Sequence, residues 1–315
     1  YNFGFNEESR QDTIFQNGEE QTTFSHELSY KNLTYAWMSF NNKHRVLRYK
    51  VGITQDQHLF KATEESVLAI PQDREFIYPW LGFEFIEKNF QEFTNIHLIS
   101  QIEDFNNGWQ LNTSVGLGNG NNNNSAWIFY KSTVKKGFQM NGHGLLLMNF
   151  HLSADLLHSH SERIITSLDS EYFYRLTENW GFYLHNINVF SHNQYRDNPV
   201  NIGGNNGLRG FPLQYQQGEH SMQLTAELRY YPHLNLFKLF DIAAATFFDS
   251  GKAFGESIAP NTTNDIIYSA GVGLRIYTPH SVGSNSIIHI DFAFPMANDD
   301  NIDGFEIRVQ AKKSF

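Results

Sequence analysis

Apolar and polar residues alternate strictly along five segments in about the last hundred residues of the chain. In the first of them, Leu224 and Leu228 share one face, while Glu227 and Arg229 share the other. A period of two residues is that of a β-strand, whose successive side chains point to opposite faces. Each apolar face is about ten residues long, the length of a tilted membrane-spanning strand, whereas soluble strands average about 5–6. The five segments are 221–231, 241–254, 265–278, 286–296 and 305–315.

The rest of the chain carries the same pattern with more interruptions and predicts further strands. Together with the C-terminal segments they make about sixteen strands, and an even number suits a bacterial barrel. The predicted fold is therefore all-β: a single transmembrane antiparallel β-barrel domain spanning residues 1–315. The further strands are predicted near 1–8, 22–31, 34–41, 44–55, 74–89, 93–103, 108–118, 125–138, 142–156, 162–177 and 180–191.

Connections between the predicted strands differ in length at the two ends of the barrel. If the first strand rises from the periplasmic side, most of the long Asn- and Gly-rich connections are outer loops, and the inner turns are short, as in bacterial barrels. The segment 56–73 is the exception, because it is predicted as an inner turn and is too long for one. The predicted outer loops are 9–21, 42–43, 90–92, 119–124, 157–161, 192–219, 255–264 and 297–304.

Composition agrees with a barrel and excludes other classes. Mean hydropathy is −0.45 and aromatic residues make up 15% of the chain, while no apolar run approaches the roughly 20 residues of a membrane helix. A polar average with many aromatic residues is typical of strands that face water on one side and lipid on the other. The net charge of −10 argues against binding nucleic acid through a basic face. The absence of Cys excludes disulfides and thiolate metal sites.

The longest predicted outer loop, 192–219, carries Arg209 among several glycines. A guanidinium inside a barrel needs an acceptor, and its fork of donors suits a carboxylate. Glu227 and Asp249 follow on the predicted lumen faces of the next two strands. We therefore predict that the loop folds into the lumen and that wall carboxylates hold its Arg. The glycines that would allow close approach to the wall are Gly203, Gly204, Gly207 and Gly210.

These motifs resemble those of the BamA/TamA/FhaC superfamily of outer-membrane assembly factors and two-partner secretion transporters. The resemblance rests on "GGNNGLRGF" before a strand, "FFDSG" one strand later, five strands after the loop and a terminal Phe. It implies a sixteen-stranded barrel whose sixth outer loop places an Arg-Gly-aromatic tip against the acid of a Phe-x-Asp-x-Gly motif. Carried over to this chain, these motifs are Arg209, Gly210 and Phe211 in the loop, and Phe247, Asp249 and Gly251 on the wall.

Transporters of this superfamily usually carry periplasmic POTRA domains, which capture client proteins, before the barrel. Predicted strands and loops take up all 315 residues of this chain, which leaves no space for such a domain. Either those domains were removed, or this is a barrel-only branch, or another domain precedes Tyr1. The chain has no initiating Met and no visible signal peptide, so we interpret it as a mature or trimmed chain.

Charges of both signs alternate on the predicted lumen faces of the last five strands. This interleaving favours a paired lining over a conduit that guides a substrate. Small residues on the same faces are expected to leave space inside the barrel; they are Ala243, Ala245, Gly271 and Gly273. The lumen charges are Glu227, Arg229, Arg275, Asp291, Glu306 and Arg308.

The last strand ends in an aromatic residue with apolar residues on the same face. This pattern resembles the assembly signal that barrel-insertion machinery reads at the C-terminus. Its residues here are Ile307, Val309 and Phe315.

Catalysis and metal binding are not favoured by the sequence. His158 and His160 are two residues apart, but no third ligand lies nearby, so we expect an exposed loop there and no metal. His143, His151 and His289 are expected in the lumen or at an interface. No Ser stands beside a His and an acid in a convincing arrangement, so we predict no enzyme and no cofactor.

The resemblance implies a bacterial outer-membrane barrel that inserts or translocates a partner protein, through its lumen or through a lateral seam between its first and last strands. The expected partners are outer-membrane lipid, lipopolysaccharide and a client protein, with no nucleic acid. Two alternatives stay open. One is a barrel that anchors a fused or partner domain, lipase-type or another surface protein, without transport of its own. The other is a plugged small-solute channel.

Overall fold

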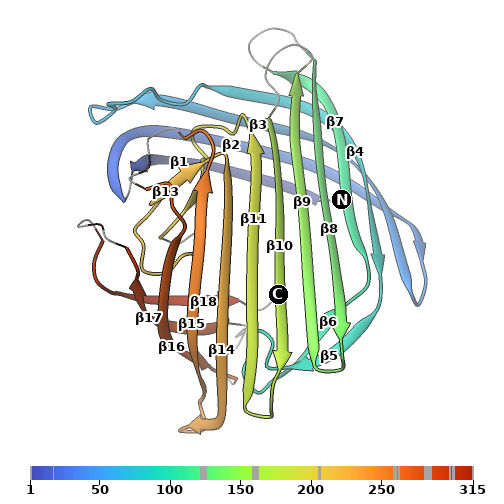
Figure 1. The fold of residues 1–315 in the computed structure, drawn as a ribbon. Helices are drawn as coiled ribbons and strands as arrows, with labels where there is room; N and C mark the ends of the chain where they lie inside the picture. Colours follow the sequence, from blue (N-terminus) through green and yellow to red (C-terminus); the bar gives the residue numbers. More distant parts are fainter. Residues whose placement is uncertain are drawn as a thin grey trace.

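The computed structural model of the chain is dominated by one large antiparallel β-sheet that curls into a barrel (Figure 1). Fourteen strands form this sheet in chain order, each paired with its neighbours. Two short hairpins, β5–β6 and β12–β13, lie outside it. The structure describes residues 2–16, 18–120, 126–157, 163–204, 207–257, 261, 263–279, 286–297, 299 and 302–313.

Most strands of the sheet are longer than soluble strands, which average about 5–6 residues. The sheet contains β1 (Asn2–Gln16), β2 (Glu19–Asn41), β3 (Arg45–Ala62), β4 (Arg74–Glu87), β7 (Gln110–Gly120), β8 (Ala126–Met140), β9 (Gly144–Leu157), β10 (Arg163–Arg175), β11 (Trp180–His192), β14 (His220–Leu236), β15 (Phe240–Phe254), β16 (Ile267–Tyr277), β17 (Ser286–Pro295) and β18 (Glu306–Lys313). The hairpins are β5 (Phe90–Thr94) with β6 (Ile102–Asn106), and β12 (Val200–Ile202) with β13 (Gln216–Gly218).

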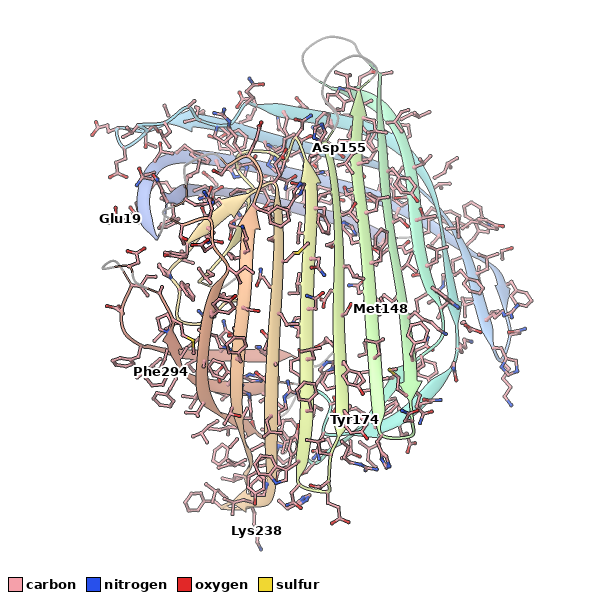
Figure 2. All side chains as sticks on the ribbon, viewed as in Figure 1. Glu19, Met148, Asp155, Tyr174, Lys238 and Phe294 are labelled. Atoms are coloured by element: carbon pink, nitrogen blue, oxygen red, sulfur yellow. The ribbon has the colours of Figure 1, made fainter. Side chains whose placement is uncertain are left out.

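Burial on the strands is inverted relative to a soluble protein. Val272 and Phe294, the latter labelled in Figure 2, are 50% and 52% exposed on the outer face. Glu227, Asp249 and Asp291 on the opposite face are 3%, 0% and 2% exposed. An apolar outside and a charged, buried inside suit a barrel that sits in lipid. The predicted all-β antiparallel barrel is therefore confirmed, with its faces as the alternation predicted.

No helix in the part of the chain that the structure describes has the length and apolarity to span a membrane.

The sheet has fourteen strands where the sequence predicted about sixteen, and two errors account for the difference. Segments 22–31 and 34–41 were predicted as two strands, but β2 runs through both, with Leu33 paired to Ile53 of β3. No Gly or Pro interrupts β2 at this point, so the polar letters "KN" did not mark a turn. Segment 93–103 was predicted as a wall strand, but only its ends are extended, within the β5–β6 hairpin.

This change of count alters which connections share an end of the barrel. The connections 63–73 and 193–219 leave the sheet at one end, which we call the loop end. The connections 42–44 and 88–109 lie at the other, which we call the hairpin end. The predictions of 42–43 and 90–92 as outer loops and of 56–73 as an inner turn are therefore wrong. Likewise, the long loop is the fifth connection at its end, where the resemblance implied the sixth.

The first and last strands, β1 and β18, are the two edges of the sheet. In the described residues no backbone ladder joins β1 to β18, whereas every other neighbouring pair is joined. We call this junction the seam.

Candidate functional site

The long connection between β11 and β14 folds back into the barrel, and its glycines make that path feasible. A positive φ favours glycine, because a Cβ would strain the backbone there. At Gly207 a Cβ would also lie 2.2 Å from Oε1 of Gln223 on the wall. Positive φ occurs at all the loop glycines singled out from the sequence, namely Gly203 (103°), Gly204 (55°), Gly207 (99°) and Gly210 (85°).

Arg209 stands at the centre of the site, 5% exposed, and contacts carboxylates from three strands. It pairs in bidentate fashion with Asp249 of β15, at 2.7 Å from Nε to Oδ2 and 2.8 Å from Nη2 to Oδ1. Its Nη1 contacts Glu227 of β14 at 3.1 Å and Asp291 of β17 at 3.2 Å. The guanidinium carbon lies 3.4 Å from the ring centre of Phe247, a cation–π contact. We call these residues the clamp.

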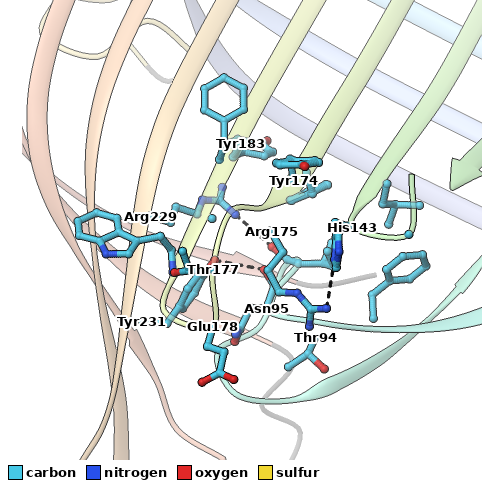
Figure 3. A pocket seen from close by; sticks show the side chains of 18 of the residues that line it. Thr94, Asn95, His143, Tyr174, Arg175, Thr177, Glu178, Tyr183, Arg229 and Tyr231 are labelled. Carbon is cyan, nitrogen blue, oxygen red and sulfur yellow. Dashed lines mark hydrogen bonds between the residues drawn. The ribbon is translucent and has the colours of Figure 1, made fainter. Parts of the chain in front are cut away.

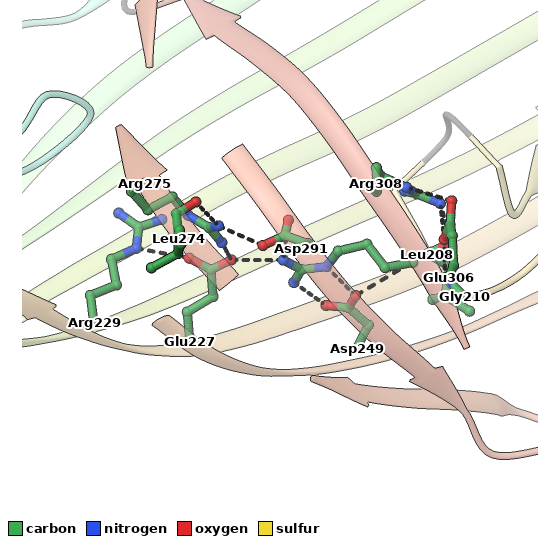
Figure 4. Close-up of polar contacts among 11 residues, drawn as sticks. Leu208, Gly210, Glu227, Arg229, Asp249, Leu274, Arg275, Asp291, Glu306 and Arg308 are labelled. Carbon is green, nitrogen blue, oxygen red and sulfur yellow. Dashed lines mark hydrogen bonds and ion pairs between the residues drawn. The ribbon is translucent and has the colours of Figure 1, made fainter. Parts of the chain in front are cut away.

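Further charges surround the clamp and compensate it (Figure 4). Arg275 of β16 contacts Glu227 at 3.1 Å and Asp291 at 2.5 Å. Arg229 donates from Nε to Glu227 at 2.8 Å. With Arg209, the cluster holds three guanidinium groups and three carboxylates, all in ion pairs. Buried charges are tolerated when they are paired in this way. The alternating lumen charges therefore form a paired lining around the loop.

The last strand holds the loop through its main chain. The backbone N–H of Gly210 donates to Oε2 of Glu306 at 2.5 Å. Arg308 donates to both oxygens of the same carboxylate, at 3.0 and 2.9 Å, and reaches the carbonyl oxygen of Leu208 at 3.4 Å. The tip of the loop is thus bonded to β18, which is one side of the seam.

Apolar contacts also pack the loop against the barrel wall. Phe211 is 2% exposed, and its ring centre lies 5.1 Å from that of Tyr215. Both belong to a buried cluster that also contains Leu208 of the loop. A Cβ on Gly251 would lie 3.0 Å from Cδ1 of Leu208. The glycine of the "FFDSG" motif therefore leaves room for the loop. The wall residues of this cluster are Ala253 and Ile267.

A second segment enters the lumen from the hairpin end. In the turn between β5 and β6, the backbone N–H groups of Ile96, His97 and Leu98 donate hydrogen bonds to the carboxylate of Glu103 on β6, at 3.0–3.1 Å. Arg229, from the cluster around the clamp, donates to the carbonyl oxygen of Ile96 at 3.1 Å. The segment 95–101, which we call the hairpin plug, is thus tied to the same charge network as the loop.

The hairpin plug fills space that the sequence predicted to be empty. Ile99 is 3% exposed and packs in a cluster with Ala243. The two glycines on the same face are also covered, because a Cβ on Gly271 would lie 2.4 Å from the Phe247 ring and one on Gly273 would lie 2.0 Å from Asp291. These small residues make room for the clamp and the plug.

A cavity of about 190 Å³ remains beside the plug; its lining includes Tyr183, Arg229 and Tyr231, labelled in Figure 3.

The hairpin plug was missed because 93–103 was assigned to the wall. The available signal was that Ile96 and Leu98 would point to one face of a strand and Ile99 to the opposite face. This signal does not separate a plug from the wall, because β17 also has apolar residues on both faces, with Ile287 4% and Ile288 40% exposed.

The remaining predicted positions fall into separate places. Ile307 and Val309 are 56% and 64% exposed on the outer face of β18. His289 is buried, in accord with a lumen position. Phe315, His158 and His160 lie outside the described residues, so the assembly signal and the paired histidines stay predictions.

Comparison with known proteins supports the fold. No protein-family model matches the sequence, and no curated protein does. The structure is similar to BamA from Haemophilus ducreyi lacking POTRA domains 1–3, with a TM-score of 0.53 and 11% identity over 98% of this chain and 70% of that one. It is also similar to CdiB from Escherichia coli, with a TM-score of 0.49 and 12% identity over 92% of this chain; the chain spans 55% of the length of CdiB. The likeness to BamA confirms the barrel fold that the motifs implied.

Proposed function

We propose that this protein is a barrel of the bacterial outer membrane that inserts or translocates a partner protein, with loop 193–219 as a releasable plug. The observation that carries the proposal is the clamp. Arg209 crosses from the loop to three wall carboxylates, and all of these charges are buried and compensated. A channel for small solutes has no need of a segment fixed in its lumen by a buried ion cluster.

The seam supplies a route by which a partner could leave the barrel sideways. Edge strands present unpaired N–H and C=O groups, and an added strand can pair with them. Glu306 of β18 bonds to the backbone of Gly210 at the loop tip. If the loop moves, β18 loses this hydrogen bond to the loop tip. If an incoming strand pairs with β18 and shifts it, the loop tip loses the same bond.

Insertion through the seam can be tested with cross-links, because the chain contains no Cys and introduced thiols would be the only ones. The purified barrel is placed in lipid vesicles together with a urea-unfolded eight-stranded outer-membrane barrel, and the folding rate of the latter is measured. We expect the wild-type protein to accelerate this folding. Cysteine pairs that join Phe3 or Phe5 of β1 to Ile307 or Val309 of β18 through a bismaleimide are expected to abolish the acceleration.

A matched control uses cysteines at Ile290 and Val309, which are already partners in the β17–β18 ladder. Cross-linking this pair leaves the seam free and is expected to preserve the acceleration. Full activity of the seam-locked protein would rule out the lateral route. No acceleration by the wild-type protein would rule out insertion of this class of client.

A further inference from the structure

Two histidines face each other near the loop end of the barrel. Nε2 of His26 on β2 lies 2.9 Å from Nδ1 of His58 on β3. The other ring nitrogen of each is bonded to a carboxylate: His26 Nδ1 lies 2.6 Å from Asp12, and His58 Nε2 lies 3.1 Å from Asp56. His26 is 2% exposed. The outer nitrogens, His26 Nδ1 and His58 Nε2, are therefore bonded to carboxylates, and the inner nitrogens, His26 Nε2 and His58 Nδ1, face each other.

The ring nitrogens of this pair cannot all find a suitable hydrogen-bond partner unless a cation lies between the two rings. An ionised carboxylate only accepts, so Asp12 and Asp56 require N–H groups on the outer nitrogens of the two rings. In neutral rings the inner nitrogens then carry lone pairs, which point at each other across 2.9 Å. A shared proton or a metal ion between them removes this repulsion. A histidine that ligates a metal typically donates its other N–H to a carboxylate, which is the arrangement of both rings here.

A third ligand comes from the root of the long loop. A carboxylate oxygen of Asp197 and one nitrogen of each ring all lie within 4.8 Å of one another. Arg74 of β4 holds Asp197 at 2.8 and 2.7 Å. A carboxylate offers about four lone-pair positions, so Asp197 keeps acceptor capacity in this pair. A cavity of about 420 Å³ adjoins these three residues and leaves room for a water ligand.

We propose that His26, His58 and Asp197 bind a divalent transition-metal ion of the zinc type, with Asp12 and Asp56 orienting the two rings. Two imidazoles and one carboxylate with an open fourth position suit Zn²⁺, and all-oxygen sites suit Ca²⁺ or Mg²⁺ instead. Zn–N bonds of about 2.0–2.1 Å place two tetrahedral nitrogens roughly 3.3 Å apart, so the rings need to separate by only a few tenths of an ångström.

Such an ion would join two parts of the barrel that the clamp does not join. The histidines belong to β2 and β3, whereas the clamp is built on β14, β15 and β17. The ring centre of Tyr195, at the loop root, lies 4.1 Å from the guanidinium carbon of Arg74 and 5.0 Å from that of Arg163. The ion would add a second anchor for the long loop, on the N-terminal wall. This proposal does not depend on the transport role.

The site can be tested with metal alone on the purified, chelator-treated barrel in detergent. Titration with Co²⁺ is expected to give the visible absorption of a tetrahedral ion at one ion per chain, and Zn²⁺ is expected to displace it and raise the unfolding temperature. His58→Ala and Asp197→Asn are expected to remove both effects. Asp12→Asn, which changes only the orienting carboxylate, is expected to weaken affinity by about 10–100-fold.

Two controls separate this site from incidental binding. His185 is also paired with a carboxylate, Asp169, at 2.8 Å, but it belongs to no metal-binding group among the described residues. His185→Ala is expected to keep the full Co²⁺ spectrum, as is the double variant of His158 and His160. Absence of the spectrum in the wild type, or its persistence in a correctly folded His58→Ala barrel, would overturn the proposal; the first result would leave a shared proton between the rings.

Discussion

Arg209 of the long loop and Asp249 of β15 form a two-point ion pair although forty residues separate them in the chain. The side chain of Asp249 is fully buried, and that of Arg209 is 6% exposed. Water therefore compensates neither charge, and each depends on the other. Glu227 and Asp291 accept from the remaining side of the same guanidinium. The position of the loop is thus set by one side chain that is bonded to three wall strands.

Removal of either partner of this pair is expected to destabilise the barrel strongly. Arg209→Ala leaves the buried carboxylate of Asp249 without its cation, and Asp249→Ala leaves the guanidinium without its main acceptor. Each change should cost about 3–5 kcal/mol of unfolding free energy. The double variant should lose clearly less than the sum of the two, because the residues share one interaction. Urea unfolding in detergent, followed by the mobility shift between folded and unfolded barrel, measures these values.

A surface ion pair provides the control for the clamp variants. Lys61 and Glu27 are 2.6 Å apart, with side chains 66% and 45% exposed. Lys61→Ala is expected to change stability little, because exposed pairs contribute little. Fully additive losses at Arg209 and Asp249 would show that the two residues do not act as a pair.

A glycine of the long loop and a glycine in the turn between β8 and β9 are expected to differ in how much they tolerate a side chain. Gly203→Ala adds backbone strain at φ 103° and places the new Cβ 2.4 Å from the backbone carbonyl oxygen of Pro212. Gly142→Ala adds strain at φ 69°, but no atom lies within 4 Å of the new Cβ. The Gly142 change should cost about 1–2 kcal/mol, and the Gly203 change should cost more, because main-chain atoms must shift.

Thermal unfolding of the Gly203→Ala and Gly142→Ala variants measures the difference. An equal loss in both would mean that the loop does not fold back on itself at Gly203.

The hairpin plug is expected to loosen when Glu103 loses its charge. Glu103→Gln weakens the acceptor of three backbone N–H groups, and hydrogen bonds to a charged group contribute about 1.5–3 kcal/mol. Hydrogen exchange at Ile96, His97 and Leu98 should therefore accelerate by roughly tenfold to a hundredfold. Mass spectrometry of the peptide that covers 95–101 measures the rate. Glu92→Gln, at an exposed position of β5, should leave the rate unchanged; equal acceleration in both variants would argue against a specific role of the Glu103 carboxylate.

The C-terminal third of the fold could be predicted from the sequence because one rule governs it. Segment 221–231 and its four successors alternate with period two, and lipid on one side and charges on the other keep that pattern strict. Arg209 and Asp249 were predictable for the same reason, since a cation on a loop that enters the lumen needs an acid on a lumen face. Glu227 was predicted because the alternation places it on the lumen face of its strand, and it does contact Arg209.

Other features depend on contacts that no local pattern encodes. The two predicted strands inside β2 could not be merged from the sequence, because the polar pair Lys31 and Asn32 is as compatible with a turn as with a strand that continues through it. The sequence of the turn 95–101 predicts a strand, and only the structure shows that its apolar residues face the inside of the barrel. Asp197 and His26 are far apart in the chain, and only the curling of the sheet brings them within reach of each other.

Single-channel conductance in planar lipid bilayers tests the plug most directly. The wild-type barrel is expected to be closed with brief openings, because the clamp and the hairpin plug both occupy the lumen. Arg209→Ala is expected to open more often and for longer, and Arg209→Ala combined with Glu103→Gln is expected to conduct most. A large, steady conductance in the wild type that neither variant changes would contradict a plugged lumen and would favour a small-solute channel.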